Sequence, residues 1–263
     1  MIDPPRGSSL ASMAAVGTIE SRPVNDLPKL LVIVRHAESA RNLAKVGRVF
    51  FADDEARSDL KNEPDHLIRL TETGWSQARE LGTKLRDSFQ SFDSVFHSGY
   101  RRTQETAEAV LEAWPADERS RMAVRAHLFL RERDVGYAFN FTADEARQTF
   151  PWLQPHWDLT GHFFARPPGG ESLADVAMRV HLFLESSRHD LAGKSVLIVT
   201  HGGPLRMFRY WLEAWTYEDV IDRWDREAVP NCCVVSYRAG ERSDRLERVS
   251  LPPVVRPLDE PEK

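Results

Sequence analysis

LLVIVRHAESARN, residues 30–42, is the stretch of sequence that decides the predicted fold. Its first five residues are all apolar, which is typical of a strand buried inside a sheet. Arg35 and His36 follow at once, and both side chains need water or a charged partner when they lie near a core. We therefore expect residues 30–34 to form a central strand whose carboxyl end presents Arg35 and His36 to an anion.

Apolar runs alternate with helical patterns along the rest of the chain. This indicates an α/β fold with a mostly parallel central sheet flanked by helices on both faces. Helices are expected from Thr71, despite two glycines, and from Ser172, where apolar residues recur on one face. Thr142 and Glu145 fit a capping box before a shorter helix. The expected strands are residues 30–34, 93–97, 122–129, 195–200 and 232–237.

The sequence predicts one large domain, residues 29–239, between two segments of different composition. Residues 1–28 are rich in proline, serine and glycine and are expected to be a disordered leader. Residues 240–263 alternate charge and proline and are expected to be a C-terminal tail. Residues 43–70 and 137–169 interrupt the alternation of strands and helices. Long connections of this kind often form lids, so we expect them to make a partial cap.

The charge and cysteine content argue against several classes of protein. The chain of 263 residues carries 35 Lys and Arg against 40 Asp and Glu, so neither a nucleic-acid nor an anionic-membrane binder is expected. No apolar run approaches the roughly 20 residues of a membrane span. Cys232 and Cys233 are the only cysteines, and neighbours cannot form an unstrained disulfide, so a reducing, cytoplasmic location is expected. The sequence leaves the oligomeric state open.

Charged residues stand near the ends of the expected strands. Arg102 lies shortly after the second strand, Glu132 just past the third, and His201 directly after the fourth, where Gly202 follows it. Ligands of open parallel sheets bind beyond the carboxyl ends of the strands, which lie about 4.8 Å apart. These residues are therefore expected to share one pocket with His36.

That set of side chains suits phosphoryl transfer. Guanidinium groups bind phosphate oxygens in pairs and keep their charge at any working pH. A histidine crowded by arginines stays neutral and nucleophilic, so it can form a covalent phosphohistidine. A nearby carboxylic acid can protonate the departing oxygen, and the N–H groups of a helix that opens at Gly202 point toward the same anion.

The same motifs resemble those of the histidine phosphatase superfamily, in its phosphoglycerate-mutase-like branch. RHAESARN is similar to the RHG-containing signature of the family, and HSGYRRTQETA is similar to its S-P-L-x-R-A-x-x-T-A segment. LRERDVG resembles L-x-E-x-x-x-G, and PPGGESLADVAMRV and VTHGGPLR resemble two later motifs. They occur in the order of the family between about residues 30 and 237.

The resemblance implies a metal-independent phosphomonoesterase that needs no cofactor and acts on a small phosphorylated substrate. It makes His36 the phosphorylated nucleophile, Glu132 the proton donor and His201 the residue opposite the nucleophile. Asn42 and Arg102, rather than Arg101, are implied to bind the phosphoryl group, together with Arg35. Metal-ligand spacings such as H-E-x-x-H are absent from the sequence, so no metal site is expected.

Several residues depart from the family pattern, and the two departures from the mutase motifs favour hydrolysis over isomerisation. Ala37 replaces the usual glycine of the signature, and Gly99 and Tyr100 replace the usual Pro-Leu. The tyrosine that follows the catalytic glutamate in mutases is missing after Glu132, and no G-W-x-D segment follows Asn42. Two alternatives stay open: phosphoglycerate-mutase-type phosphoryl transfer, and a non-catalytic phosphate-recognition module, which has no need for Glu132.

Four residues of the expected cap could line the mouth of the site. They are His66, Arg69, His162 and Arg166.

Overall fold

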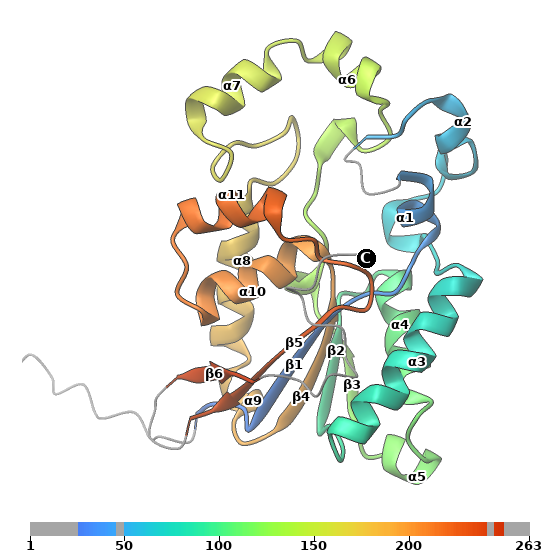
Figure 1. The fold of residues 1–263 in the computed structure, drawn as a ribbon, viewed down its shortest axis with the longest axis vertical. Helices are drawn as coiled ribbons and strands as arrows, with labels where there is room; N and C mark the ends of the chain where they lie inside the picture. The colour runs from blue at the N-terminus through green and yellow to red at the C-terminus, as the bar shows by residue number, and fades with distance from the viewer. Residues whose placement is uncertain (1–25, 46–49, 241–244, 250–263) are drawn as a thin grey trace, which may run out of the picture.

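A six-stranded sheet forms the centre of the computed structural model, which describes residues 26–45, 50–240 and 245–249. The strand order is β3-β2-β4-β1-β5-β6, so the first strand of the chain lies inside the sheet (Figure 1). The strands are β1 (Leu30–Arg35), β2 (Ser94–His97), β3 (Ala123–Ala126), β4 (Ser195–Thr200), β5 (Val234–Ala239) and β6 (Leu246–Arg248).

The sheet is mixed, with three parallel pairings out of five. β4 pairs in parallel with β1 on one side and with β2 on the other, and β2 pairs in parallel with β3. β5 runs antiparallel to both β1 and β6. Because Arg35 lies opposite Thr200, and His97 lies opposite Val199, three neighbouring strands end at the same edge. The predicted mostly parallel α/β sheet is confirmed.

Helices cover both faces of the sheet, and the strands between them are therefore buried on both sides. Leu31 and Ile33 of β1 belong to one apolar cluster, and Val32 and Val34 belong to another. All four side chains are fully buried, as expected for a central strand. The first cluster includes residues of α8 (Leu173–Ser186) and α10 (Gly202–Leu212), and the second includes residues of α3 (Glu72–Ser88) and α4 (Arg101–Leu111) (Figure 1).

Two glycines in α3 mark places where backbones approach closely. A Cβ on Gly74 would lie 2.0 Å from Glu38 O, and one on Gly82 would lie 2.3 Å from Val110 O. The helix therefore keeps both glycines although each lowers its intrinsic propensity. Thr71, where the sequence predicts the start of this helix, caps it by accepting a hydrogen bond from Gly74 N.

The two long segments predicted as a cap contact each other beyond the end of the sheet (Figure 1). Phe51 forms an isolated bridge with Thr142, and Arg57 donates hydrogen bonds to both carboxylate oxygens of Glu145. Thr142 and Glu145 form the predicted capping box. The helices of this region are α1 (Ala40–Lys45), α2 (Asp54–Arg57), α6 (Ala143–Thr149) and α7 (Leu153–Thr160).

Strand boundaries correct three predictions. β3 ends at Ala126 rather than residue 129, because the chain turns into a short 3-10 helix, Leu128–Leu130. β5 begins at Val234, since Cys232 has a positive φ of 58° and its N–H donates to Arg35 O. β6 lies within residues 240–263, where the sequence predicts a tail.

Most of the predicted leader, residues 1–25, lies outside the described residues. The remaining helices are α5 (Ala116–Arg119), α9 (Arg188–Leu191) and α11 (Tyr217–Arg226). No helix in the described part of the chain has the length and apolar character needed to cross a membrane.

Candidate active site

Two histidines meet at the edge where the parallel strands end. His36 follows β1 and His201 follows β4, its neighbour in the sheet. Their ring centroids are 5.0 Å apart, and the two ring planes make an angle of 67°. The exposed fractions of His36 and His201 are only 3% and 0%. The structure thus brings both predicted histidines into one buried position.

The protonation of His36 follows from its backbone contact. Its Nδ1 lies 2.7 Å from Ala37 O, and a carbonyl oxygen only accepts, so Nδ1 carries the hydrogen. Burial, followed by the charges of Arg102 and Arg35, holds the pKa of His36 well below 6.5. The ring is therefore neutral, and its Nε2 lone pair is available to attack an electrophile.

His201 leaves one nitrogen open. Its Nε2 lies 2.8 Å from Ser98 Oγ, whereas its buried Nδ1 has no hydrogen-bond partner. Burial and then Arg102 hold the pKa of His201 well below 6.5. Buried polar atoms are rarely unpaired, so Nδ1 marks a position that a ligand atom can fill.

Arg35 supplies a second open position. Its Nη1 donates to Val229 O, while its Nε is buried without a partner. A Cβ on Gly202 would lie 3.9 Å from that Nε, so Gly202 borders the guanidinium group. An anion beside the histidine pair would satisfy both the Arg35 Nε and the His201 Nδ1 positions.

Arg102, rather than Arg101, points into the site. Arg102 is only 3% exposed, and its Nη1 donates to Asp65 O at 2.7 Å and to Asp65 Oδ1 at 3.1 Å. Arg101 is exposed and lies 3.9 Å from Glu105. Arg102 therefore already has an anionic partner, which the sequence did not reveal.

Glu132 sits at the amino end of α10. Its Oε1 accepts hydrogen bonds from Arg133 N at 2.8 Å and from Gly203 N at 3.2 Å. The Nη2 of Arg179 donates to Glu132 O, which fixes the backbone of this loop. Glu132 is thus joined to the helix that follows His201.

Asn42 is held beside His36 through a residue near the other end of the chain. Its Oδ1 accepts from Ser39 Oγ at 2.9 Å and from Asn231 Nδ2 at 3.2 Å. The same Asn231 nitrogen lies 2.9 Å from His36 O. The side-chain oxygen of Asn42 is therefore engaged by the protein.

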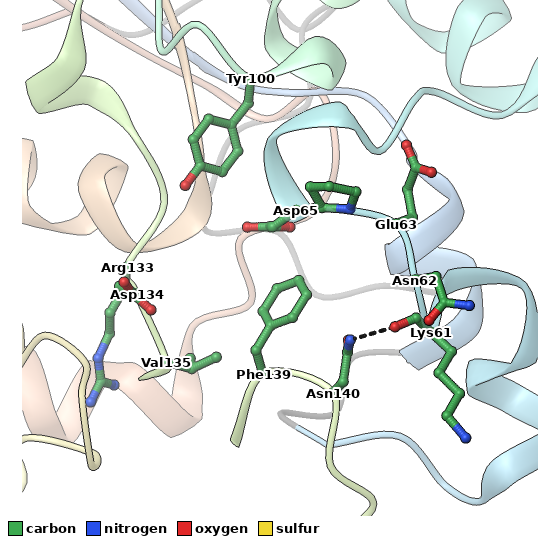
Figure 2. A pocket seen from close by; sticks show the side chains of 11 residues that line it. Lys61, Asn62, Glu63, Asp65, Tyr100, Arg133, Asp134, Val135, Phe139 and Asn140 are labelled. Atoms are coloured by element: carbon green, nitrogen blue, oxygen red, sulfur yellow. Dashed lines mark hydrogen bonds between the residues drawn. The ribbon is translucent and has the colours of Figure 1, made fainter. Parts of the chain in front are cut away.

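A cavity of about 380 Å³ adjoins this group (Figure 2). Two of its lining residues, Asp65 and Tyr100, reach the predicted site. Asp65 binds Arg102, and the Tyr100 ring centroid lies 5.1 Å from that of His201. Tyr100 stands beside the arginine motif, where the sequence indicates only a departure from the family pattern, whereas Asp65 lies in a charged segment that carries no local signal. The cavity is lined by Lys61, Asn62, Glu63, Pro64, Asp65, Tyr100, Arg133, Asp134, Val135, Phe139 and Asn140.

The four residues suggested for the mouth do not line this cavity. His66 comes closest, with its ring centroid 6.5 Å from that of Tyr100. Arg69 pairs with Glu105, His162 lies 3.7 Å from Asp158, and Arg166 pairs with Asp175 of α8. Within the described residues, no three His, Cys, Asp or Glu side chains are grouped so as to hold a metal ion.

Comparison with known proteins gives consistent matches over most of the chain. The family model described as "Histidine phosphatase superfamily (branch 1)" matches residues 31–251. A 2,3-bisphosphoglycerate-dependent phosphoglycerate mutase of Rhizobium etli is 33% identical over 84% of this chain and 96% of its own length. A phosphoglycerate mutase-like protein of Arabidopsis thaliana is 35% identical over 72% of this chain and 68% of its own length.

Solved structures share the fold. The α-ribazole phosphatase from Shigella flexneri superposes with a TM-score of 0.64 at 23% identity, covering 88% of this chain and 100% of that chain. A mycobacterial glucosyl-3-phosphoglycerate phosphatase in complex with inorganic phosphate superposes with a TM-score of 0.56 at 21% identity, covering 84% and 94%.

Proposed function

We propose that this chain, which belongs to branch 1 of the histidine phosphatase superfamily, hydrolyses a small phosphomonoester through a phosphohistidine formed on His36. The observation that carries the proposal is the pairing of two neutral, buried imidazoles whose remaining nitrogens are free. His36 keeps Nε2 available for attack, and His201 keeps Nδ1 without a partner.

In the first step the His36 Nε2 lone pair attacks phosphorus. The P–N bond forms as the bond from phosphorus to the ester oxygen breaks, and Glu132 in its acid form gives its proton to the departing alcohol. Arg35 Nε and His201 Nδ1 fill their open positions with phosphoryl oxygens. This role of His201 requires a hydrogen on Nδ1, which is present when Ser98 Oγ donates to Nε2.

In the second step water attacks the phosphohistidine. Glu132, now a carboxylate, accepts the proton of the attacking water, the P–N bond breaks, and inorganic phosphate leaves. Glu132 is thereby protonated again, and His36 returns to its neutral form.

The first test is the loss of the nucleophile. We expect His36→Ala to abolish turnover of an aryl phosphate without loss of fold, and we expect acid quenching of the wild-type reaction with radiolabelled substrate to trap a phosphoenzyme. His189→Ala, a change of an exposed histidine of α9, serves as the control and should keep full activity. If His36→Ala turned over the aryl phosphate as fast as the wild type, His36 could not be the nucleophile and the proposal would be refuted.

A mutase is the second candidate, because the relatives at 33% and 35% identity bear mutase names. A mutase returns the phosphoryl group to the bound substrate instead of passing it to water. Incubation with 3-phosphoglycerate, with and without 2,3-bisphosphoglycerate, separates the two. We expect release of inorganic phosphate from simple monoesters to exceed isomerisation of 3-phosphoglycerate. Phosphate binding without either reaction would instead identify a recognition module.

A further inference from the structure

The centre of the cavity holds a carboxylate. Figure 2 shows Asp65 near the middle of the view with Tyr100 and Phe139 around it. The two basic lining residues, Lys61 and Arg133, extend away from Asp65 in the same view. Arg133 is turned to the backbone, since its Nε donates to Glu171 O at 2.8 Å. The cavity therefore presents a negative rather than a positive charge to its contents.

Asp65 sits between two guanidinium groups. Its carboxylate accepts from Arg102 Nη1 at 3.1 Å and from Arg102 Nη2 at 3.4 Å, and its Oδ1 lies 3.9 Å from Arg41 Nε. The guanidinium group of Arg41 packs 3.5 Å from the centroid of the Phe139 ring, and its Nη2 donates to Phe139 O, whereas its buried Nη1 has no hydrogen-bond partner. The carboxylate of Asp65 thus occupies the place where a second anionic group of a substrate would meet these two cations.

The other charged residues that line the cavity also oppose the binding of a second anionic group. Three acidic residues, Glu63, Asp65 and Asp134, line it against the two basic ones. A carboxylate or second phosphate on the substrate would lose its hydration beside Asp65, and like charges placed together oppose binding.

An unpaired acceptor points to the complementary group. The Oδ1 of Asn140, which also lines the cavity, is buried without a hydrogen-bond partner, while its Nδ2 donates to Lys61 O at 3.0 Å. Carboxylates and an amide oxygen are all acceptors, so a bound molecule satisfies them with hydroxyl or ammonium hydrogens. A site built from acceptors also rejects molecules that lack donors.

Resting on the proposed hydrolysis, we infer that Asp65 selects phosphomonoesters whose leaving alcohol is neutral or cationic and rich in hydrogen-bond donors. The phosphoryl group is then the single anionic group of the substrate. Phosphoglycerates and bisphosphates, which carry a second anionic group close to the first, are disfavoured. Asp65 is a specificity-determining residue, and it takes no part in bond making or breaking.

Aminoethyl, hydroxyethyl and carboxyethyl phosphate test the inference, because the three differ mainly in the charge of one end group. We expect kcat/KM of the wild type to fall in that order. Asp65→Asn removes the charge but keeps Oδ1 as an acceptor for Arg102. It should raise the ratio of kcat/KM for carboxyethyl over aminoethyl phosphate by at least about tenfold, equivalent to about 1.4 kcal/mol. Differences in leaving-group reactivity cancel, since each substrate is compared with itself in two enzymes.

Asp59→Asn is the matched control, since Asp59 is an exposed residue of the same cap segment that does not line the cavity. In Asp59→Asn the ratio of kcat/KM for carboxyethyl over aminoethyl phosphate should stay at the wild-type value. Competitive inhibition by inorganic phosphate checks that the phosphoryl site of Asp65→Asn is intact.

An unchanged substrate ratio in Asp65→Asn would overturn the inference while leaving the hydrolysis in place. If kcat/KM also rose equally on all three substrates, Asp65 would compete with the phosphoryl group itself rather than select the leaving alcohol. If no monoester is hydrolysed by the wild type and no phosphoenzyme forms, the proposed function has failed instead.

Discussion

Gly203→Ala tests the placement of the proposed proton donor. The added Cβ would lie 2.7 Å from Glu132 Oε1, whereas ordinary contact begins at 3.4 Å, so the carboxylate must move by about 0.7 Å. The obstructing atom is the end of a flexible side chain, so the stability of the fold should change little. A displacement of about 1 Å at a reacting group can lower a rate by roughly 100-fold, and we expect a loss of about 10- to 100-fold here.

The loss should depend on the leaving group. An alkoxide needs a proton as it departs, whereas nitrophenolate leaves without one. We therefore expect kcat/KM, which reports the steps up to the departure of the alcohol, to fall for an alkyl phosphate and to stay nearly constant for nitrophenyl phosphate. In an enzyme that already carries Glu132→Gln, the Gly203→Ala change should add little, since both act on one group.

Equal losses on the two substrates would show that Glu132 is not the acid. No loss on either would refute the displacement, because the carboxylate would then accommodate the methyl group without leaving its position. Thermal denaturation of Gly203→Ala, run beside the kinetics, separates a local shift of Glu132 from general unfolding.

Three further predictions follow from the packing and the protonation of the site. Gly82→Ala places a Cβ against the Val110 backbone, which cannot yield as a side chain can, so urea denaturation should show the free energy of unfolding falling by roughly 1–3 kcal/mol. Ser98→Ala removes the hydroxyl at His201 Nε2; kcat/KM should drop by about tenfold, and nitrogen NMR should show a changed tautomer, because the hydroxyl no longer fixes it. The folded-state pKa of His36 is held well below 6.5, so the unfolded chain binds more protons below that pH. The contribution of His36 to the free energy of unfolding is then fully present above pH 6.5. It declines by up to about 1.4 kcal/mol per pH unit as the pH falls toward the folded-state pKa, so the total decline should be shallower in His36→Gln.

Local patterns are enough to predict the elements that carry the two histidines. Residues 30–34 and 196–199 are uninterrupted apolar runs, and they lie in two buried strands that are parallel neighbours in the sheet. The polar residues that follow such strands must gather at one edge, because parallel strands end together. The meeting of His36 and His201 is therefore a consequence of sequence pattern and topology combined.

Tertiary contacts explain what sequence patterns could not predict. Asp65 lies in a charged connection whose composition resembles an exposed loop, and only the folded cap places it on Arg102. Asn231 reaches the site because β5 returns antiparallel to β1, an orientation that its apolar residues alone do not specify. β6 has three residues, of which two are exposed, so it lacks an apolar run that pattern analysis can detect.

Supports for the amino-terminal half of the site come from far along the chain. Arg35 is held by Val229 O, and the amide of Asn231 contacts both the His36 carbonyl and Asn42. During synthesis, a ribosome-bound chain that stops before residue 229 already contains every proposed reacting side chain yet lacks these braces. Termination before residue 229 should consequently yield an inert product instead of a slower enzyme, and catalytic competence should appear only once residues 229–231 have emerged.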